Sequence, residues 1–102
     1  MSGRILQINF KFNVSGAEYR QAVAPLAGDI AAVPGLRWKI WIINEAESEA
    51  GGIHLFDDEA AVQAYLAGPI VAGIVQHPAL SDFSVKQFDV MEEQTAITRG
   101  PV

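Results

Sequence analysis

His54 is the residue of this chain whose side chain is best suited to move a proton. It lies within an apolar run, Ala50 to Phe56, and an unperturbed imidazole titrates close to neutral pH, so a histidine in mid-strand can act as a general base. Asn9 and Tyr65 carry groups that can donate a hydrogen bond to an oxygen on which negative charge develops. The simpler interpretation is an imidazole paired at a subunit interface and an Asn9 side chain facing solvent or that interface. His54 and Asn9 are the candidate catalytic residues.

Large aromatic side chains could form an apolar cage around a small molecule. Aromatic residues also dominate ordinary cores and interfaces, so packing is the simpler explanation for each of them. The candidate substrate-binding residues are Trp38, Trp41, Phe10, Phe12, Phe56 and Tyr65.

Both tryptophans fall in one predicted strand. Strand alternation sends Trp38 and Trp41 to opposite faces of a sheet, so one lines a core or pocket while the other meets a second surface. A short chain has few elements with which to cover both faces, which predicts a homodimer with an internal cavity. Lys39 shares a face with Trp41 and Arg37, and we expect it to form a salt bridge across the dimer rather than take part in catalysis.

Alternation of apolar and polar residues predicts the strands. The clearest runs over residues 4–12, where Leu6, Ile8 and Phe10 alternate with polar side chains. In a later strand, Gly51-Gly52 indicates a bulge or a close approach of two backbones. The predicted strands are residues 4–12, 36–43, 50–56 and 83–90.

Two helical segments separate these strands. Ser15, with Glu18 three residues later, is a candidate N-cap for a helix that runs to about Ala32, and Pro25 inside it predicts a kink or a split. The acids of residues 57–59 begin a second helix, which breaks near Gly68-Pro69 and resumes to about residue 76.

The order of these elements predicts an α+β, ferredoxin-like βαββαβ fold, in which a four-stranded antiparallel sheet carries two helices on one face. Burying the other face against a second copy would give a dimeric α/β barrel. We expect residues 1–102 to form one domain, with an irregular tail over residues 91–102 that could reach the partner.

Composition excludes several function classes. The formal net charge of -5 and the scattered basic residues disfavour nucleic acid as a partner, and the absence of cysteine removes disulfides and thiolate chemistry. The first residues lack the basic and apolar regions of a signal peptide, so we expect a cytoplasmic location. Residues 60–75 contain no run of about 20 apolar residues, so we interpret them as a buried helix and expect no membrane partner.

A metal or cofactor site is disfavoured. His54 and His77 are the two histidines of the chain and fall on different elements, while the acids at 57–59 are explained by helix capping. Gly51-Gly52 enters a strand and therefore cannot form a phosphate loop. Haem is the more specific alternative to a cofactor-free site, with His77 at a helix end as its axial ligand. We expect no metal and no cofactor.

The chain resembles the YdhR-like monooxygenases, small bacterial proteins with the dimeric α/β-barrel fold. The resemblance rests on four segments in the same order along the chain. They are Leu6-Gln7-Ile8-Asn9-Phe10-Lys11-Phe12-Asn13, Pro34-Gly35-Leu36-Arg37-Trp38-Lys39-Ile40-Trp41, Glu49-Ala50-Gly51-Gly52-Ile53-His54-Leu55-Phe56 and Phe88-Asp89-Val90.

The resemblance implies a pocket between sheet and helices, and oxidation of a small electron-rich aromatic or enolic compound by O2 without a cofactor. An oxygenase of this type must bind a substrate that supplies the electrons, and must stabilise its deprotonated form. The alternative is a dimeric module that binds such a compound without turning it over. A pocket lined with aromatic residues suits both classes.

Overall fold

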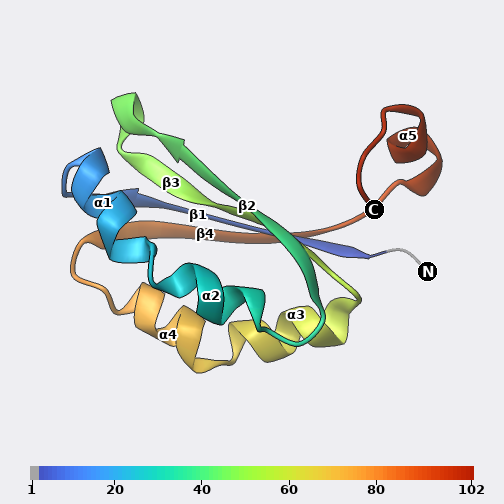
Figure 1. The fold of residues 1–102 in the computed structure, drawn as a ribbon, viewed down its shortest axis with the longest axis horizontal. Coiled ribbons are helices and arrows are strands. Elements are labelled where there is room, and N and C mark those ends of the chain that lie inside the picture. Colours follow the sequence, from blue (N-terminus) through green and yellow to red (C-terminus); the bar gives the residue numbers. More distant parts are fainter. Residues whose placement is uncertain (1–2) are drawn as a thin grey trace.

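The computed structural model describes residues 3–102 and has the predicted order of elements (Figure 1). The strands are β1 (Arg4–Phe12), β2 (Leu36–Asn44), β3 (Glu49–Phe56) and β4 (Leu80–Asp89). The helices are α1 (Gly16–Val23), α2 (Leu26–Ala31), α3 (Glu59–Leu66), α4 (Pro69–Val75) and α5 (Glu92–Ile97), and a short 3₁₀ turn spans Glu45–Glu47.

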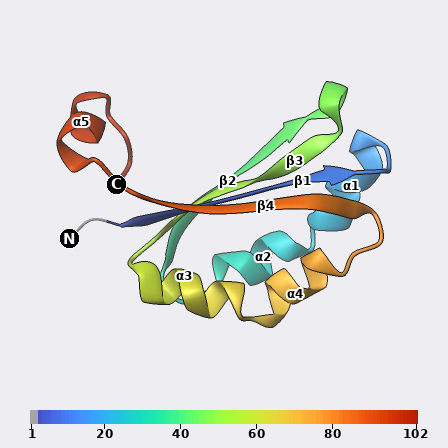
Figure 2. The same cartoon turned by 180° about the vertical axis from the view of Figure 1, so that it is seen from behind.

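The strands form one 4-stranded sheet in the order β2-β3-β1-β4, and every neighbouring pair is antiparallel. The expected antiparallel pairing of β2 with β3 is therefore confirmed. Helices α2, α3 and α4 lie on the same side of the sheet (Figure 2). This is the predicted α+β, ferredoxin-like arrangement, in which β3 lies between β1 and β2.

The alternation along β1 decides which sheet face is buried. Leu6, Ile8, Phe10 and Phe12 are at most 6% exposed, and their polar neighbours point to the other face. The antiparallel register places Gly52 opposite Ile8 and His54 opposite Leu6. Because directly opposite residues share a face, His54 points toward the helices.

Each predicted helix is divided in two. The Ser15 hydroxyl accepts a hydrogen bond from the Glu18 amide at 3.1 Å, so the predicted N-cap of α1 is confirmed. Pro25 separates α1 from α2, and Gly68-Pro69 separates α3 from α4. Between residues 3 and 102, no helix is long and apolar enough to cross a membrane.

The sheet face opposite the helices is partly apolar. Ile40 on β2 and Phe88 on β4 lie on it, with 52% and 47% of their surfaces exposed. The expectation of an irregular tail over residues 91–102 is corrected by α5, which lies on this side of the sheet (Figure 2). The indole nitrogen of Trp38 donates a hydrogen bond to the Pro101 carbonyl at 2.8 Å, which ties the end of the chain to this face.

Gly51 marks the close backbone approach that the sequence indicated. A Cβ at this position would overlap the carbonyl oxygen of Ile8, and its φ is 159°. β1 and β3 can therefore pair here because residue 51 has no side chain.

We expect Gly51→Ala to lower the free energy of unfolding by about 2 kcal/mol or more, since either the ladder or the backbone of β3 must shift. Gly28→Ala is the matched control, because a Cβ at Gly28 in α2 meets no atom within 4 Å. Urea unfolding of both variants measures the difference. Equal stability of the two variants would contradict the close-approach explanation.

Candidate functional site

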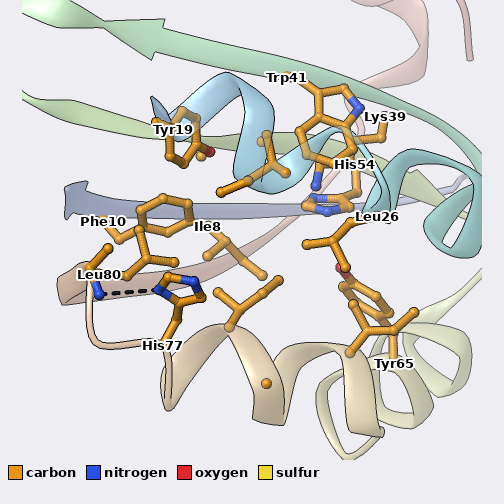
Figure 3. A pocket seen from close by; sticks show the side chains of 18 of the residues that line it. Ile8, Phe10, Tyr19, Leu26, Lys39, Trp41, His54, Tyr65, His77 and Leu80 are labelled. Atoms are coloured by element: carbon orange, nitrogen blue, oxygen red, sulfur yellow. Dashed lines mark hydrogen bonds between the residues drawn. The ribbon is translucent and has the colours of Figure 1, made fainter. Parts of the chain in front are cut away.

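A cavity of about 420 Å³ lies between the sheet and the helices (Figure 3). Its size is within the range of sites that bind drug-sized molecules. Small residues on its wall, such as Ala22, Gly52 and Gly73, leave space that larger side chains would fill. The larger lining side chains are Ile8, Phe10, Val14, Tyr19, Val23, Leu26, Lys39, Trp41, His54, Tyr65, Pro69, Ile70, Ile74, His77 and Leu80.

His54 reaches this cavity from β3 and is 1% exposed. Its Nδ1 lies 3.0 Å from the carbonyl oxygen of Leu6. A carbonyl can only accept, so Nδ1 carries the proton and donates it. In the neutral ring, Nε2 is then an unprotonated acceptor, and this buried atom has no hydrogen-bond partner in the described part of the chain.

The environment of His54 keeps it neutral. Burial and, to a lesser extent, the positive charge of Lys39 lower the pKa of the imidazole to about 4, although the hydrogen bond to Leu6 opposes the shift. The ring is held by Phe56, whose ring centroid is 6.0 Å away in a stacked arrangement, and by Tyr65 at 5.5 Å. His54 therefore presents a fixed lone pair across the physiological pH range.

Tyr65 supplies a second unpartnered polar atom. It comes from α3, is 5% exposed, and its buried hydroxyl has no hydrogen-bond partner among residues 3–102. Burial raises the pKa of this phenol to about 12, so the hydroxyl is protonated and able to donate. A buried polar group without a partner costs roughly 1–3 kcal/mol. The cavity therefore holds an unsatisfied acceptor and an unsatisfied donor on adjacent rings.

Lys39 is a further functional candidate, although the sequence indicated that it would form a salt bridge across the dimer. Its side chain points into the cavity, and its Nζ lies 3.5 Å from the centroid of the Trp41 ring. A Cβ at Gly52 would lie 3.3 Å from both the Lys39 Nζ and the His54 Cε1. The lysine side chain therefore occupies the space above Gly52 and ends beside the imidazole. Burial lowers the pKa of Lys39 to about 8.

The expected salt bridge of Lys39 across a dimer stays a prediction, because it involves a second copy of the chain. Within residues 3–102, Arg37 pairs with Asp57 at 2.7 Å. Only part of the signal for Lys39 lay in the sequence, where it shares a strand face with Trp41. Its position opposite His54 follows from the strand register of the structure.

The structure divides the other predicted site residues into three groups. Phe10 and Trp41 line the cavity. Phe12 and Phe56 lie behind it in the core, where Phe12 stacks on Tyr19 with ring centroids 5.0 Å apart. Asn9 and Trp38 point to the other sheet face.

On that face, the side-chain amide of Asn9 donates to Glu49 at 3.1 Å. Asn9 therefore does not meet His54, and Trp38 is separated from the cavity by the sheet.

His77 does not suit the axial role that the haem alternative gave it. Its Nδ1 accepts a hydrogen bond from the Ala79 amide at 3.1 Å, drawn as the dashed line in Figure 3. The neutral ring then carries its proton on Nε2, which leaves no free lone pair for iron. Within residues 3–102, no three histidine or acidic side chains gather where they could hold a metal ion.

We expect His54 to make stability depend on pH. Its pKa is about 4 in the folded chain against an ordinary value near 6.5, so the unfolded chain binds more protons between these values. The free energy of unfolding should therefore fall by about 3 kcal/mol as the pH drops from 7 to 4. His54→Gln should flatten this part of the profile in urea titrations. A His54→Gln profile parallel to that of the original chain would contradict a buried neutral imidazole.

Comparison with solved structures finds the same fold in several bacterial proteins. A protein of unknown function from Nitrosomonas europaea is 22% identical, with a TM-score of 0.76 and coverage of 89% of this chain and 91% of the other. SnoaB from Streptomyces nogalater, described as a cofactor-independent oxygenase, is 19% identical, with a TM-score of 0.73 and coverage of 90% and 96%. The heme-degrader MhuD from Mycobacterium tuberculosis is 22% identical, with a TM-score of 0.66 and coverage of 85% and 95%.

At these identities the neighbours show a shared fold alone. A search of curated proteins by sequence found no match. A family model described as "Putative mono-oxygenase ydhR" matches residues 5–101. Nearly the whole chain is covered, including the strands that carry Lys39 and His54 and the helix that carries Tyr65, so this protein belongs to the ydhR family that this model describes.

Proposed function

We propose that this protein is a cofactor-independent monooxygenase that oxidises a small electron-rich aromatic or enolic compound in the cavity between sheet and helices. The observation that carries the proposal is a pair of buried polar atoms on the cavity wall, His54 Nε2 and the Tyr65 hydroxyl, neither of which has a hydrogen-bond partner within residues 3–102. Buried polar groups in folded proteins are normally paired, so two orphaned groups on adjacent rings require a partner from outside the chain.

The two rings lie close enough, with centroids 5.5 Å apart, that the proposed ligand uses one hydroxyl group to pair with both atoms. A phenolic or enolic O–H donates to His54 Nε2, and its oxygen accepts from the Tyr65 hydroxyl. The remaining cavity wall is largely apolar and suits a hydrocarbon or aromatic body. The site therefore complements a flat apolar molecule with a hydroxyl at one end.

Lys39 supplies the charge that makes this hydroxyl acidic. Burial disfavours positive charge on both Lys39 and His54 in the free protein, and the charge of Lys39 further disfavours a protonated His54. An anionic oxygen between them removes that repulsion, so the deprotonated ligand is stabilised while His54 takes up the proton. The site thus favours the phenolate or enolate, the electron-rich form that reacts with O2.

The substrate supplies the electrons in the proposed reaction. For an anthrone-like compound, a CH₂ group becomes C=O: one atom of O2 enters the product, and the other leaves as water with the two hydrogens. The protein binds the compound, holds the proton at His54 Nε2 and excludes bulk water. The family assignment and the fold shared with SnoaB support this reaction class.

A second copy of the chain is proposed to cover the open sheet face. The exposed side chains of Ile40 and Phe88 lie on it, and packing them against a partner removes apolar surface from water. We expect sedimentation at micromolar concentration to give the mass of a dimer, with an interface of about 2,000 Å² in total. Ile40→Lys should produce monomers. A monomeric mass for the original chain would contradict the proposed dimer.

The function is tested by oxygen uptake with metal-free protein and a panel of anthrone and naphthols, without flavin or nicotinamide. We expect one O2 consumed per substrate and ¹⁸O from ¹⁸O2 in the product. His54→Ala should lower the rate by about 100-fold or more, because the acceptor for the substrate proton is lost. Tight binding of the whole panel without oxygen uptake would instead favour the non-catalytic binding module.

Matched variants distinguish loss of turnover caused by a change in the cavity from loss caused by a general effect on folding. Gly73→Leu should block turnover by filling the cavity, while Gly28→Leu, also in a helix but outside the cavity lining, should not. Lys39→Met should lower the rate, and Lys86→Met at an exposed position should leave it unchanged. Asn9→Ala tests the residue that sequence reasoning placed in catalysis, and its position on the other sheet face predicts an unchanged rate. Equal effects of both glycine variants would place the reaction outside this cavity.

A further inference from the structure

Among the lysines of residues 3–102, Lys39 is the one that is neither exposed nor within ion-pair distance of a carboxylate. Lys11 lies 3.9 Å from a carboxylate oxygen of Glu49, and Lys86 is exposed on β4. Within residues 3–102, no acidic side chain lies at ion-pair distance from Lys39, and none lines the cavity. Its amine instead rests against the face of Trp41 (Figure 3).

This environment provides a neutral amine near neutral pH. Burial disfavours the ammonium form and lowers the pKa of Lys39 to about 8. At pH 8 roughly half of the Lys39 side chains are then neutral, against less than about 1% for a lysine of ordinary pKa. A neutral amine is a nucleophile, whereas an ammonium is not.

The neighbours of Lys39 suit attack on a carbonyl group. Trp41 and the other apolar side chains form a wall for an aromatic body, and the Lys39 Nζ and the His54 ring approach the same point above Gly52. The lone pair at His54 Nε2 can accept a proton from the attacking amine and return it to the leaving oxygen.

We propose that Lys39 captures aromatic aldehydes and ketones in the cavity as a reversible imine. The amine adds to the carbonyl carbon, and a proton moves from nitrogen to oxygen to give a carbinolamine. The C–O bond then breaks, C=N forms, and the carbonyl oxygen leaves as water with the two amine hydrogens. No electrons are transferred, so this activity needs no O2 and goes beyond the oxygenase reaction.

The test is reductive trapping under anaerobic conditions at pH 8. The full chain is incubated with 2-naphthaldehyde and sodium cyanoborohydride, and adducts are located by peptide mass spectrometry. We expect Lys39 to be labelled at least about 10-fold faster than the side-chain amine of Nα-acetyl-lysine amide in the same solution. This free amine is the reference because Lys11 and Lys86 lie on the sheet face that a second copy is proposed to cover. Labelling of Lys39 at or below the rate of the free amine would overturn the proposal.

Further arms separate capture in the cavity from general amine reactivity. Gly73→Leu should suppress labelling at Lys39 but not at Lys86, and His54→Gln should slow it. Propanal, which lacks an aromatic body, should show a smaller preference for Lys39, and an equal preference would contradict recognition by the cavity. The readout is an adduct mass without O2, so its failure would leave the oxygenase proposal standing, and absent oxygen uptake would leave imine capture standing.

Discussion

The hydrogen bond from His54 Nδ1 to the Leu6 carbonyl fixes the chemistry of the cavity. It joins the two central strands, β1 and β3, and places the proton of a neutral imidazole on the nitrogen that faces the sheet. The other nitrogen must then face the cavity as a bare acceptor. Without this bond, either ring nitrogen could carry the proton. The position of the acceptor beside Tyr65 and Lys39 would then be undefined.

The remaining features of the site follow from burying this acceptor in apolar surroundings. The same burial keeps the imidazole neutral, keeps the Tyr65 phenol protonated and weakens the charge on Lys39. An acceptor, a donor and a partly destabilised cation therefore meet at one end of an apolar cavity. Each becomes more stable when an acidic hydroxyl enters, which couples ligand binding to deprotonation of the ligand.

The sequence predicted the fold because strand alternation and helix stops are local signals. The apolar residues of β1 repeat with period 2, and Pro25 and Gly68-Pro69 divide the helices by removing or straining backbone hydrogen bonds. The α5 helix was missed because residues 91–102 carry no apolar periodicity. Its position depends on tertiary contact, in which Trp38 binds the Pro101 carbonyl.

The candidate site was only partly predictable. His54, Tyr65, Phe10 and Trp41 were recognised by residue type, and the structure brings them to one cavity. Alternation could not separate cavity wall from core on the same face, so Phe12 and Phe56 were grouped with them. Lys39 was expected to form a salt bridge across the dimer rather than take part in catalysis, and only the register reveals that it extends over Gly52 toward His54.

The most direct test of the central claim is ¹⁵N NMR of the His54 imidazole with and without 1-naphthol. In the free protein at pH 7 we expect the neutral tautomer with its proton on Nδ1, and an Nε2 resonance typical of a free lone pair. Adding 1-naphthol should shift the Nε2 resonance toward that of a protonated nitrogen while Nδ1 keeps its proton. A proton on Nε2 in the free protein, or an Nε2 resonance that naphthol does not move, would contradict the assignment of His54 as the acceptor of the ligand hydroxyl.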